Sequence, residues 1–269
     1  MAKLNVLIAG STGYIGVQLI KLLIKHKNIN IKYLCGNSSA GKKISSYDTS
    51  LKSKKLPRIT KYNKKYLSYV DIIFTALPNG EAQLISKDLL KKNTLIDLAA
   101  DFRLNKASDY LKWYKQKHKA LSNIKNSIYA LPEITGKLVK KFSIIGCPGC
   151  YPTSILLPLI PLVKKRSINL KNIIIDSKSG YSGAGRGVHK KFKNKNLYES
   201  LSAYGVGFHR HNSEINQELE NNTSSKINFT FTPHIIPMFR GILSTIYLDL
   251  KPGNTSVSYT HLTLPTMIR

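Results

Sequence analysis

Hydrophobic residues in the first hundred positions alternate between short continuous runs and helical spacing. Residues 4–9 (LNVLIA) form a continuous apolar run that ends at Gly10, the pattern of a parallel strand buried on both faces. In the next segment apolar residues recur at the spacing of one helix face, at Ile15, Leu19, Leu22 and Leu23. Three further strands are expected over 29–35, 70–78 and 93–100, and a second helix is expected over 80–92. This order of elements predicts a doubly wound α/β domain.

The pattern changes near Cys150. Strand-like segments now dominate, with fewer helices between them, over 172–180, 227–237 and 241–250. This change predicts a second domain of the α+β class. We therefore expect one domain over residues 1–149 and another over residues 150–252, followed by a tail over residues 253–269 that continues neither pattern.

Composition places the chain among folded globular proteins. Its 269 residues are 42% hydrophobic, enough apolar surface for two ordinary cores. The amino-terminal apolar run is too short for a signal peptide, and the longest apolar stretch, residues 155–163, is half a membrane span and contains Pro158 and Pro161. Three cysteines are too few for a disulfide scaffold. We expect a soluble, cytoplasmic protein without a membrane partner.

The net charge of +28 is the feature that would favour a nucleic-acid partner. Most of the lysines, however, are scattered among isoleucines and asparagines and form no single arm or aromatic-interleaved patch. Such a distribution is typical of solvated surfaces. We expect no nucleic-acid partner, and a basic scaffold that contacts nucleic acid is the alternative.

The segment GSTGYIG places three glycines between the first expected strand and the first expected helix. In this context glycines allow a tight turn and a close approach of the backbone to a pyrophosphate at the helix amino terminus. We expect the amides of Ser11, Thr12 and Gly13 to meet that pyrophosphate, and a plain turn between strand and helix is the alternative. The candidate cofactor residues are Gly10, Ser11, Thr12, Gly13, Tyr14, Ile15 and Gly16.

The end of the second expected strand indicates which dinucleotide binds. An NAD site usually has an acidic residue there for the ribose 2′-hydroxyl. The segment CGNSSAGKK, residues 35–43, has no carboxylate. Its hydroxyl and ammonium groups suit a 2′-phosphate, so Ser38 and Ser39 are candidate contacts and NADP is the expected cofactor. Ordinary surface lysines in a lysine-rich chain are the alternative interpretation of Lys42 and Lys43.

The segment GCPGCYPTS contains two cysteines three residues apart. Pro152 follows Cys150 closely and is typical of a first helical turn, so we expect Cys150 at a helix entrance. Unpaired amides and the helix dipole stabilise a thiolate there. Cys147 lies on the strand side, where a thiol is usually a small buried hydrophobic group. The alternative is that the two cysteines form a redox pair.

Two further segments offer partners for a reactive thiol. HRHNSEI contributes His209, His211 and Glu214, and SKSGYSGAGRG contributes Ser179 and Arg186. An imidazole near a thiol is the usual general acid or base. Planar cations and loop amides suit a phosphate or a carboxylate of the substrate. A zinc site that includes Cys150 or His234 is the alternative, although no other metal-ligand motif is present, and we expect no metal.

These segments form one combination that extends over most of the chain: IAGSTGYIG, DIIFTALPNG, IDLAADFRL, YALPEI, PGCYPTS, SGYSGAGRG, HRHNSEI and PHIIPMFRGILSTIY. The combination resembles the N-acetyl-γ-glutamyl-phosphate reductase family of the semialdehyde dehydrogenase superfamily. The resemblance implies a Rossmann-type NADP-binding domain, residues 1–149, and a catalytic and substrate domain, residues 150–252. It also implies that Cys150 is the nucleophile and His209 the general acid or base. His211 and Glu214 beside it are then expected to bind substrate, together with Ser179 and Arg186.

The resemblance further implies a reaction. NADPH would reduce N-acetyl-L-glutamyl 5-phosphate to N-acetyl-L-glutamate 5-semialdehyde and phosphate, in arginine biosynthesis, through a thioacyl intermediate on cysteine. An aspartate-semialdehyde dehydrogenase is the nearest alternative. The resemblance ends near Asp249, while the family continues with a segment that returns to the first domain, so we expect a truncated chain with a non-family tail. We also expect a homo-oligomer.

Overall fold

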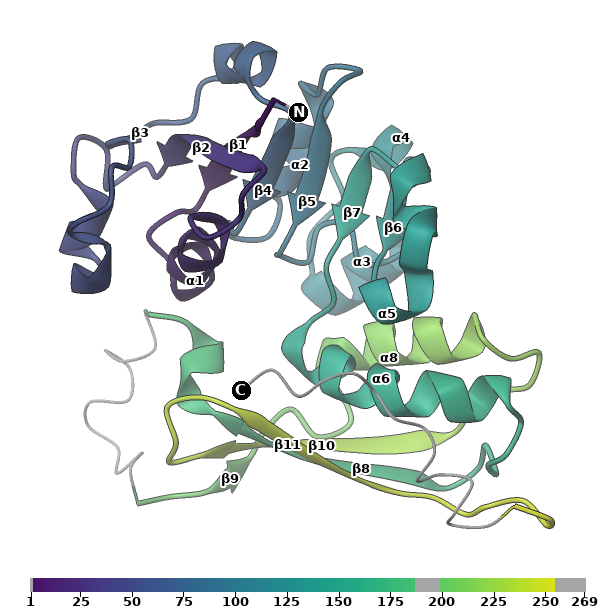
Figure 1. The fold of residues 1–269 in the computed structure, drawn as a ribbon. Helices are drawn as coiled ribbons and strands as arrows, with labels where there is room; N and C mark the ends of the chain where they lie inside the picture. Colours follow the sequence, from purple (N-terminus) through teal and green to yellow (C-terminus); the bar gives the residue numbers. More distant parts are fainter. Residues whose placement is uncertain (1, 187–198, 255–269) are drawn as a thin grey trace. The chain divides into compact units, whose positions relative to one another are not determined.

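The computed structural model describes residues 2–186 and 199–254, and it divides into two compact units. Unit 1 comprises residues 1–148 and unit 2 comprises residues 149–269. This division lies one residue before the boundary expected from the sequence. Figure 1 shows the elements of both units.

Unit 1 is built on a seven-stranded sheet in the order β3-β2-β1-β4-β5-β7-β6, and all of its strand pairs are parallel. The strands are β1 (Leu4–Ala9), β2 (Ile29–Cys35), β3 (Ile59–Thr60), β4 (Ile72–Thr75), β5 (Thr94–Asp97), β6 (Ser127–Tyr129) and β7 (Ile144–Gly146). The α-helices are α1 (Tyr14–Leu23), α2 (Glu81–Lys87), α3 (Ala107–Tyr114), α4 (Leu121–Ile124) and α5 (Pro132–Thr135). Short 3₁₀ turns are η1 (Ile44–Ser46), η2 (Thr49–Leu51), η3 (Lys64–Tyr69) and η4 (Gly136–Lys141).

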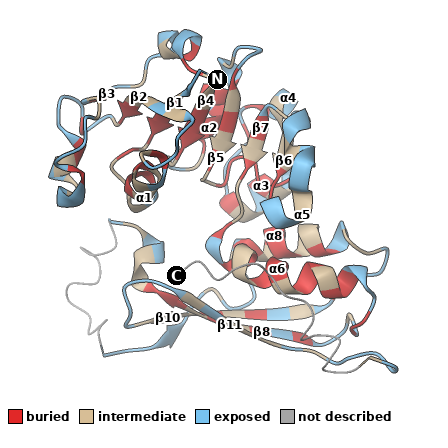
Figure 2. Cartoon of the chain, in the orientation of Figure 1, coloured by how far each residue is buried: buried red, intermediate tan, exposed pale blue. Residues whose placement is uncertain are grey.

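Residues 6–9 of the central strand β1 are apolar and buried because helices cover both faces of the sheet. Leu7 packs in a cluster with Ile85 of α2, whereas Ile8 packs in a separate cluster with Ile20 of α1. Successive side chains of a strand point to opposite faces, so α1 and α2 lie on opposite sides of β1. Figure 2 shows the resulting buried residues along these strands. The doubly wound α/β domain expected from the sequence is confirmed.

The strand order reverses between β1 and β4. From β1 the chain proceeds outward to β2 and β3, and β4 then pairs with the other side of β1 and leads to β5. Ligands of open α/β sheets bind beyond the carboxyl ends of the strands at such a switch point. The topology thereby brings the loops after β1, β2 and β4 together at one edge.

The helix expected over 80–92 is shorter in the structure, where α2 ends at Lys87. An asparagine-centred turn follows: the Asn93 side-chain oxygen accepts the amide of Leu90, and its Nδ2 donates to the carbonyl oxygens of Leu67 and Val70. Asn93 is almost fully buried. These hydrogen bonds satisfy the backbone without a helix, so the second half of this prediction is wrong.

Unit 2 contains a four-stranded mixed sheet in the order β11-β8-β10-β9, with β8 and β10 parallel and the other pairs antiparallel. Helices α6 and α8 cover one face of this sheet (Figure 1). Its elements are α6 (Cys150–Lys164), β8 (Ile173–Gly180), η5 (Tyr181–Ala184), β9 (Ser202–Ala203), α8 (His211–Glu220), β10 (Phe229–Ile236) and β11 (Ile242–Tyr247). The expected α+β character of this region is confirmed.

The apolar run 155–163 lies inside α6 despite its two prolines, and Ile155, Leu156 and Leu159 have no exposed surface. Burial at about 25 cal/mol per Å² of apolar area outweighs the missing backbone donors. Within residues 2–186 and 199–254, no helix combines the length and the hydropathy that crossing a bilayer requires.

Candidate active site and cofactor pocket

Cys150 is the first residue of α6, and its side chain is exposed. The sequence expectation of a helix entrance is confirmed. Gly149 precedes it as the N-cap residue, in an extended conformation. The amides of a first helical turn have no intrahelical acceptor, and together with the helix dipole they favour an anion. Cys150 therefore occupies a position that suits a thiolate nucleophile.

The other two cysteines are poor nucleophiles. Burial raises the pKa of both Cys35 and Cys147 to about 11, so both thiols stay protonated near neutral pH. Backbone hydrogen bonds hold Cys147 in the fold: its amide donates to the carbonyl oxygen of Asp97 (2.8 Å), and its carbonyl oxygen accepts Nε of Arg103 (2.7 Å). All three cysteines are thiols. This arrangement gives no support to a redox pair.

An aromatic cluster surrounds Tyr151, the residue after the nucleophile candidate. Its ring makes edge contacts with the rings of His209 (5.6 Å between centroids), His211 (5.9 Å) and Phe231 (5.2 Å). Its hydroxyl donates to the carbonyl oxygen of His234 and accepts the hydroxyl of Tyr204, both at 3.1 Å. Burial raises the pKa of Tyr151. The neutral phenol therefore anchors the first turn of α6 to β10.

His209 is half-buried, and its imidazole ring is uncharged at physiological pH. Burial, followed by the positive charge of Arg210, lowers its pKa to about 4. Its Nδ1 accepts the amide of His211 at 3.2 Å, and this hydrogen bond assigns the proton of the neutral ring to Nε2. The ring of His211 lies 4.7 Å away, centroid to centroid. His209 is the more exposed of the two imidazoles and can exchange protons with a ligand.

His211 and Glu214 are buried beneath this cluster. Glu214 has no exposed surface, and its Oε2 accepts the amide of Gly149 at 2.8 Å. Its Oε1 lies 3.8 Å from Nε2 of His211. The structure thus places both residues at the start of α6, beneath the backbone of that turn.

The zinc alternative finds no support. In the part of the chain that the structure describes, no three His, Cys, Asp or Glu side chains converge as metal ligands do. His234 belongs to a different group on β10, where its Nδ1 lies 3.1 Å from Oδ1 of Asp176. Lys178 forms an ion pair with the same carboxylate.

The two remaining substrate candidates lie at the end of β8. Ser179 is buried, and its hydroxyl donates to the carbonyl oxygen of Gly180 at 3.1 Å. Arg186 is exposed and directly precedes residues 187–198, which lie outside the described residues. The structure therefore places Ser179 in the packed wall of unit 2 and leaves Arg186 on its surface.

The glycine loop of unit 1 has the shape of a dinucleotide turn. Gly10 has a φ of +83°, and a Cβ there would lie 2.2 Å from the carbonyl oxygen of Ala76. A Cβ on Gly16 would lie 2.3 Å from the carbonyl oxygen of Gly10, whereas a Cβ on Gly13 would have ordinary space. Gly10 and Gly16 are thus required by the fold. Gly13, the N-cap of α1, is the glycine whose backbone a ligand could approach closely.

Hydrogen bonds within the loop select the amides that face a ligand. Both the amide and the hydroxyl of Ser11 donate to the carbonyl oxygen of Cys35 at 3.1 Å, so they join the loop to β2. The amide of Gly13 donates weakly to the carbonyl oxygen of Gly10 (3.3 Å). The amides of Ile15 and Gly16 lie in the first turn of α1, where helix geometry leaves them without intrahelical acceptors. These, with Thr12, are the best placed donors for a pyrophosphate.

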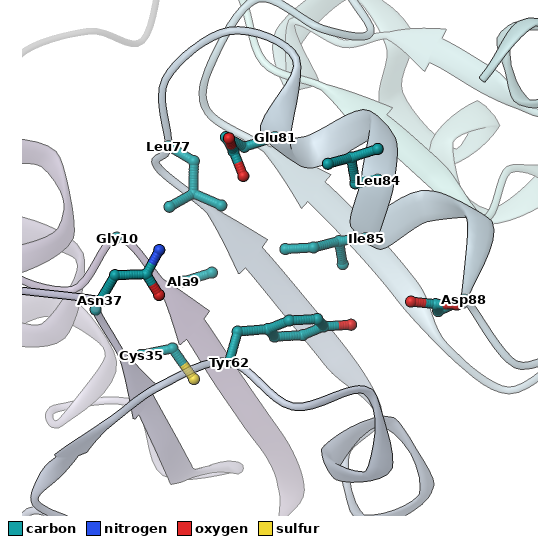
Figure 3. Close-up of a pocket in the computed structure, with 11 residues that line it drawn as sticks. Ala9, Gly10, Cys35, Asn37, Tyr62, Leu77, Glu81, Leu84, Ile85 and Asp88 are labelled. Carbon is teal, nitrogen blue, oxygen red and sulfur yellow. The ribbon is translucent and has the colours of Figure 1, made fainter. Parts of the chain in front are cut away.

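A cavity of about 250 Å³ adjoins this loop at the switch point (Figure 3). Figure 3 shows Leu77, Ile85 and Tyr62 around it, with the Tyr62 ring extending toward the side of Asp88. The Tyr62 hydroxyl is buried without a hydrogen-bond partner among the described residues, and burial raises the pKa of Tyr62 to about 12. The full lining is Ala9, Gly10, Cys35, Gly36, Asn37, Tyr62, Leu77, Glu81, Leu84, Ile85 and Asp88.

These observations fit the adenosine half of a dinucleotide. A mainly apolar cavity beside the glycine loop, with Asn37, Glu81 and Asp88 at its wall and one unsatisfied buried hydroxyl, suits a planar base that carries a few polar atoms. Sequence reasoning missed Tyr62, which belongs to none of the motif segments, and Leu77, which lies in DIIFTALPNG but carries no group whose chemistry points to a ligand. Strand periodicity could have found Leu77, because it is the second residue after β4.

Ser38 and Ser39 follow β2 but differ in exposure. Ser38 is exposed, whereas Ser39 is 3% exposed and its hydroxyl lies 3.4 Å from that of Thr12. Ser39 thus braces the glycine loop against the β2 loop. Ser38 is the serine that a ribose phosphate can reach.

Comparison with known families adds an independent finding. The family model described as "Semialdehyde dehydrogenase, NAD binding domain" matches residues 5–142, and "Semialdehyde dehydrogenase, dimerisation domain" matches residues 150–263. The second match extends past Asp249, where the motif resemblance ends, and covers residues 253–263 of the expected tail.

Curated relatives are similar over most of this chain. "Probable N-acetyl-gamma-glutamyl-phosphate reductase, chloroplastic" of Arabidopsis thaliana is 42% identical over 91% of this chain and 61% of its own length. "N-acetyl-gamma-glutamyl-phosphate reductase" of Desulforamulus reducens is 40% identical over 94% of this chain and 74% of its own length. The chain therefore spans about three fifths to three quarters of the length of these relatives.

Solved structures share the fold. An aspartate semialdehyde dehydrogenase crystallised with NADP, from Candida albicans, has a TM-score of 0.65 at 18% identity over 97% of this chain and 76% of its own. Aspartate semialdehyde dehydrogenase II from Vibrio cholerae has a TM-score of 0.71 at 15% identity over 97% of this chain and 78% of its own. At such identities the likeness concerns the fold alone.

Proposed function

The chain belongs to the N-acetyl-gamma-glutamyl-phosphate reductase family, and from this premise we propose that it reduces N-acetyl-L-glutamyl 5-phosphate with NADPH. The products are N-acetyl-L-glutamate 5-semialdehyde and phosphate, in arginine biosynthesis. The observation that carries the proposal is the exposed Cys150 thiol at the start of α6, with His209 in the same aromatic cluster as Tyr151. A thiol and an imidazole are what a thioacyl mechanism requires.

In this mechanism Cys150 attacks the acyl carbon of the acyl phosphate. The S–C bond forms, the C–O bond to phosphate breaks, and a thioester remains on Cys150. The first-turn amides and dipole of α6 stabilise the thiolate before attack. Cys147, buried and protonated, takes no part.

We assign the proton transfers to His209. Its low pKa keeps the ring neutral near pH 7, so it can accept the thiol proton of Cys150. It returns a proton to sulfur when the tetrahedral intermediate collapses and releases the aldehyde. Exposure favours His209 over the buried His211 for this role.

NADPH, when bound, supplies the hydride that reduces the thioester. The glycine loop would hold its pyrophosphate through the amides of Thr12, Ile15 and Gly16. The cavity beside Tyr62 would hold its adenosine half. Ser38 and the neighbouring lysines would contact the 2′-phosphate, because the loop after β2 has no carboxylate.

Arg186 would bind the phosphate or the carboxylate of the substrate, since a guanidinium suits such anions. Ser179 would support the same site from the end of β8. We keep these two assignments as proposals based on residue chemistry. The expected cytoplasmic location and the absence of nucleic-acid and membrane partners likewise remain predictions.

We also propose that the chain forms a homodimer through the sheet of unit 2. The matched family model is described as a dimerisation domain. On the sheet face opposite α6 and α8, Leu243 is 65% exposed, Tyr247 58% and Ile174 49%, and Tyr247 pairs with Ile174 across β11 and β8. Lys178, Asp176 and Thr245 lie between these apolar residues on the same face, and such a mixture of exposed apolar and polar groups is typical of an interface.

Sedimentation tests the dimer. Leu243→Asp should shift the wild-type dimer toward the monomer mass at micromolar concentration. Leu22→Asp, at a similarly exposed leucine on α1, is the matched control and should leave the mass unchanged. A monomeric wild type, or an unchanged mass in Leu243→Asp, contradicts this interface.

The reaction is tested by phosphate-dependent reduction of NADP with N-acetylglutamate semialdehyde. The same assay with aspartate semialdehyde is the control. Turnover of the acetylated substrate at a kcat/KM at least a hundredfold higher is the expected result. Equal turnover, or a preference for aspartate semialdehyde, contradicts the proposed substrate.

A further inference from the structure

The backbone of Gly149 is held from both sides immediately before the nucleophile. Its amide donates to Oε2 of Glu214 at 2.8 Å. Its carbonyl oxygen accepts both the amide (2.9 Å) and the hydroxyl (2.8 Å) of Thr153. The carbonyl contacts are local to α6, whereas the Glu214 contact comes from α8.

The space beside Gly149 is closed as well. A Cβ at this position would lie 2.5 Å from Nε2 and within 2.9 Å of two carbons of the His211 ring. His211 is 7% exposed, so its ring has little room to move. The ring thus packs directly on the Gly149 backbone, and Oε1 of Glu214 lies 3.8 Å from its Nε2.

From this geometry we propose that Glu214 is a positioning residue: it holds the Gly149 amide and thereby fixes Cys150 at the start of α6, with His211 as the packing wall. This inference rests on the proposed function for the role of Cys150. It replaces the expectation that Glu214 binds substrate. A side chain without exposed surface, placed under the backbone of the turn, acts on the nucleophile through Gly149.

The burial of Glu214 makes its contact with Gly149 consequential. A buried backbone amide that loses its acceptor retains a desolvation cost, and the turn before Cys150 would rearrange to recover a partner. Small displacements of a reacting atom reduce rates strongly, because the bound geometry must be close to that of attack. The hydrogen bond, rather than the charge of the carboxylate, is therefore the feature that Cys150 depends on.

Two substitutions separate hydrogen bond from charge. Glu214→Gln removes the charge but keeps an oxygen that can accept the Gly149 amide, and Glu214→Ala removes both. We expect Glu214→Ala to lower kcat about tenfold or more relative to Glu214→Gln, with KM values within about threefold of each other. A substrate-binding role predicts instead that both variants raise KM.

A second readout does not depend on the reductase reaction. Alkylation of Cys150 by iodoacetamide at pH 8, followed by mass spectrometry of its peptide, should be about tenfold slower in Glu214→Ala than in Glu214→Gln. Amide exchange at Gly149 should be faster in the alanine variant by a similar factor. If the wild type is alkylated at Cys150 but reduces no substrate, the proposed function fails and the positioning role is still decided by these rates. Equal alkylation and exchange in the two variants, both folded, would overturn the inference.

Discussion

The neutral His209 ring should make the stability of this protein depend on pH in a specific window. The pKa of His209 is lowered to about 4 in the folded chain, from an ordinary value of 6.5. The unfolded chain therefore takes up a proton that the folded chain does not as the pH falls from 6.5 toward 4. The free energy of unfolding is therefore unaffected by this group above pH 6.5, and it decreases as the pH falls from 6.5 toward 4.

The two pKa values give the magnitude. Between pH 7 and pH 5 the unfolded chain gains about 2 kcal/mol from protonating this ring, because at pH 5 the folded ring remains mostly neutral. The perturbation is His209→Gln, which keeps a polar side chain of similar size but does not titrate. Every other group titrates in both chains, so the difference between them isolates His209.

Urea unfolding at pH 7 and pH 5 measures this difference. The wild type should lose about 2 kcal/mol more than His209→Gln between the two pH values. The acid limb of kcat/KM should correspondingly fall nearer pH 4 than pH 6.5, since the neutral ring is the base. Parallel pH dependences in the two chains, or an acid limb at 6.5, would refute the neutral His209.

Three further predictions concern the nucleophile, the cofactor and the turn at Gly149, directly before the nucleophile. Cys150→Ser should lower kcat by a thousandfold or more, whereas Cys147→Ser should retain most activity in the NADP-reduction assay, and equal losses would restore the redox pair. NADP should be preferred to NAD in kcat/KM, and Tyr62→Ala should weaken NADP binding about tenfold in a fluorescence titration while Tyr69→Ala, at an exposed tyrosine, leaves it unchanged. Gly149→Ala should lower the melting temperature, and His211→Ala should offset part of that loss in the double variant, because the added methyl group collides with the His211 ring. Strict additivity of the last two effects would contradict the packing described.

The sequence predicts best the elements that are buried on both faces and the elements whose ends carry a characteristic residue nearby in the sequence. β1 is recognisable from residues 4–9 because helices bury both of its faces, so its positions other than Asn5 are apolar. The entrance of α6 is recognisable because Pro152 and the glycine before Cys150 mark it locally. The end of α2 is not recognisable from the sequence, because the Asn93 side chain that follows it hydrogen-bonds to Leu67 and Val70, more than twenty residues earlier in the chain.

The cofactor site shows the same limit. The glycine loop is a local motif, and the structure contains the expected turn at Gly10. Which amides remain for a ligand depends on β2, because the Cys35 carbonyl oxygen takes the Ser11 amide. Tyr62 reaches the cavity from a segment beyond β3, a strand of two residues with no periodicity to detect. The motif thus predicts the turn, whereas hydrogen bonds to distant segments determine which of its backbone amides can still donate to a ligand.

The active-site residues extend this argument from location to role. His209, His211 and Glu214 belong to one motif of seven residues, and that motif alone suggests one shared task near the substrate. In the fold, Glu214 is fully buried and contacts Gly149, 65 residues earlier, while His209 keeps exposed surface. The start of α8 separates them: His209 lies two residues before the helix and keeps exposed surface, whereas Glu214 lies in its first turn and contacts the start of α6. Residue type therefore predicts that these side chains serve Cys150, but the packing of α8 on α6 determines that His209 stays accessible to a ligand and that Glu214 holds the backbone of Gly149.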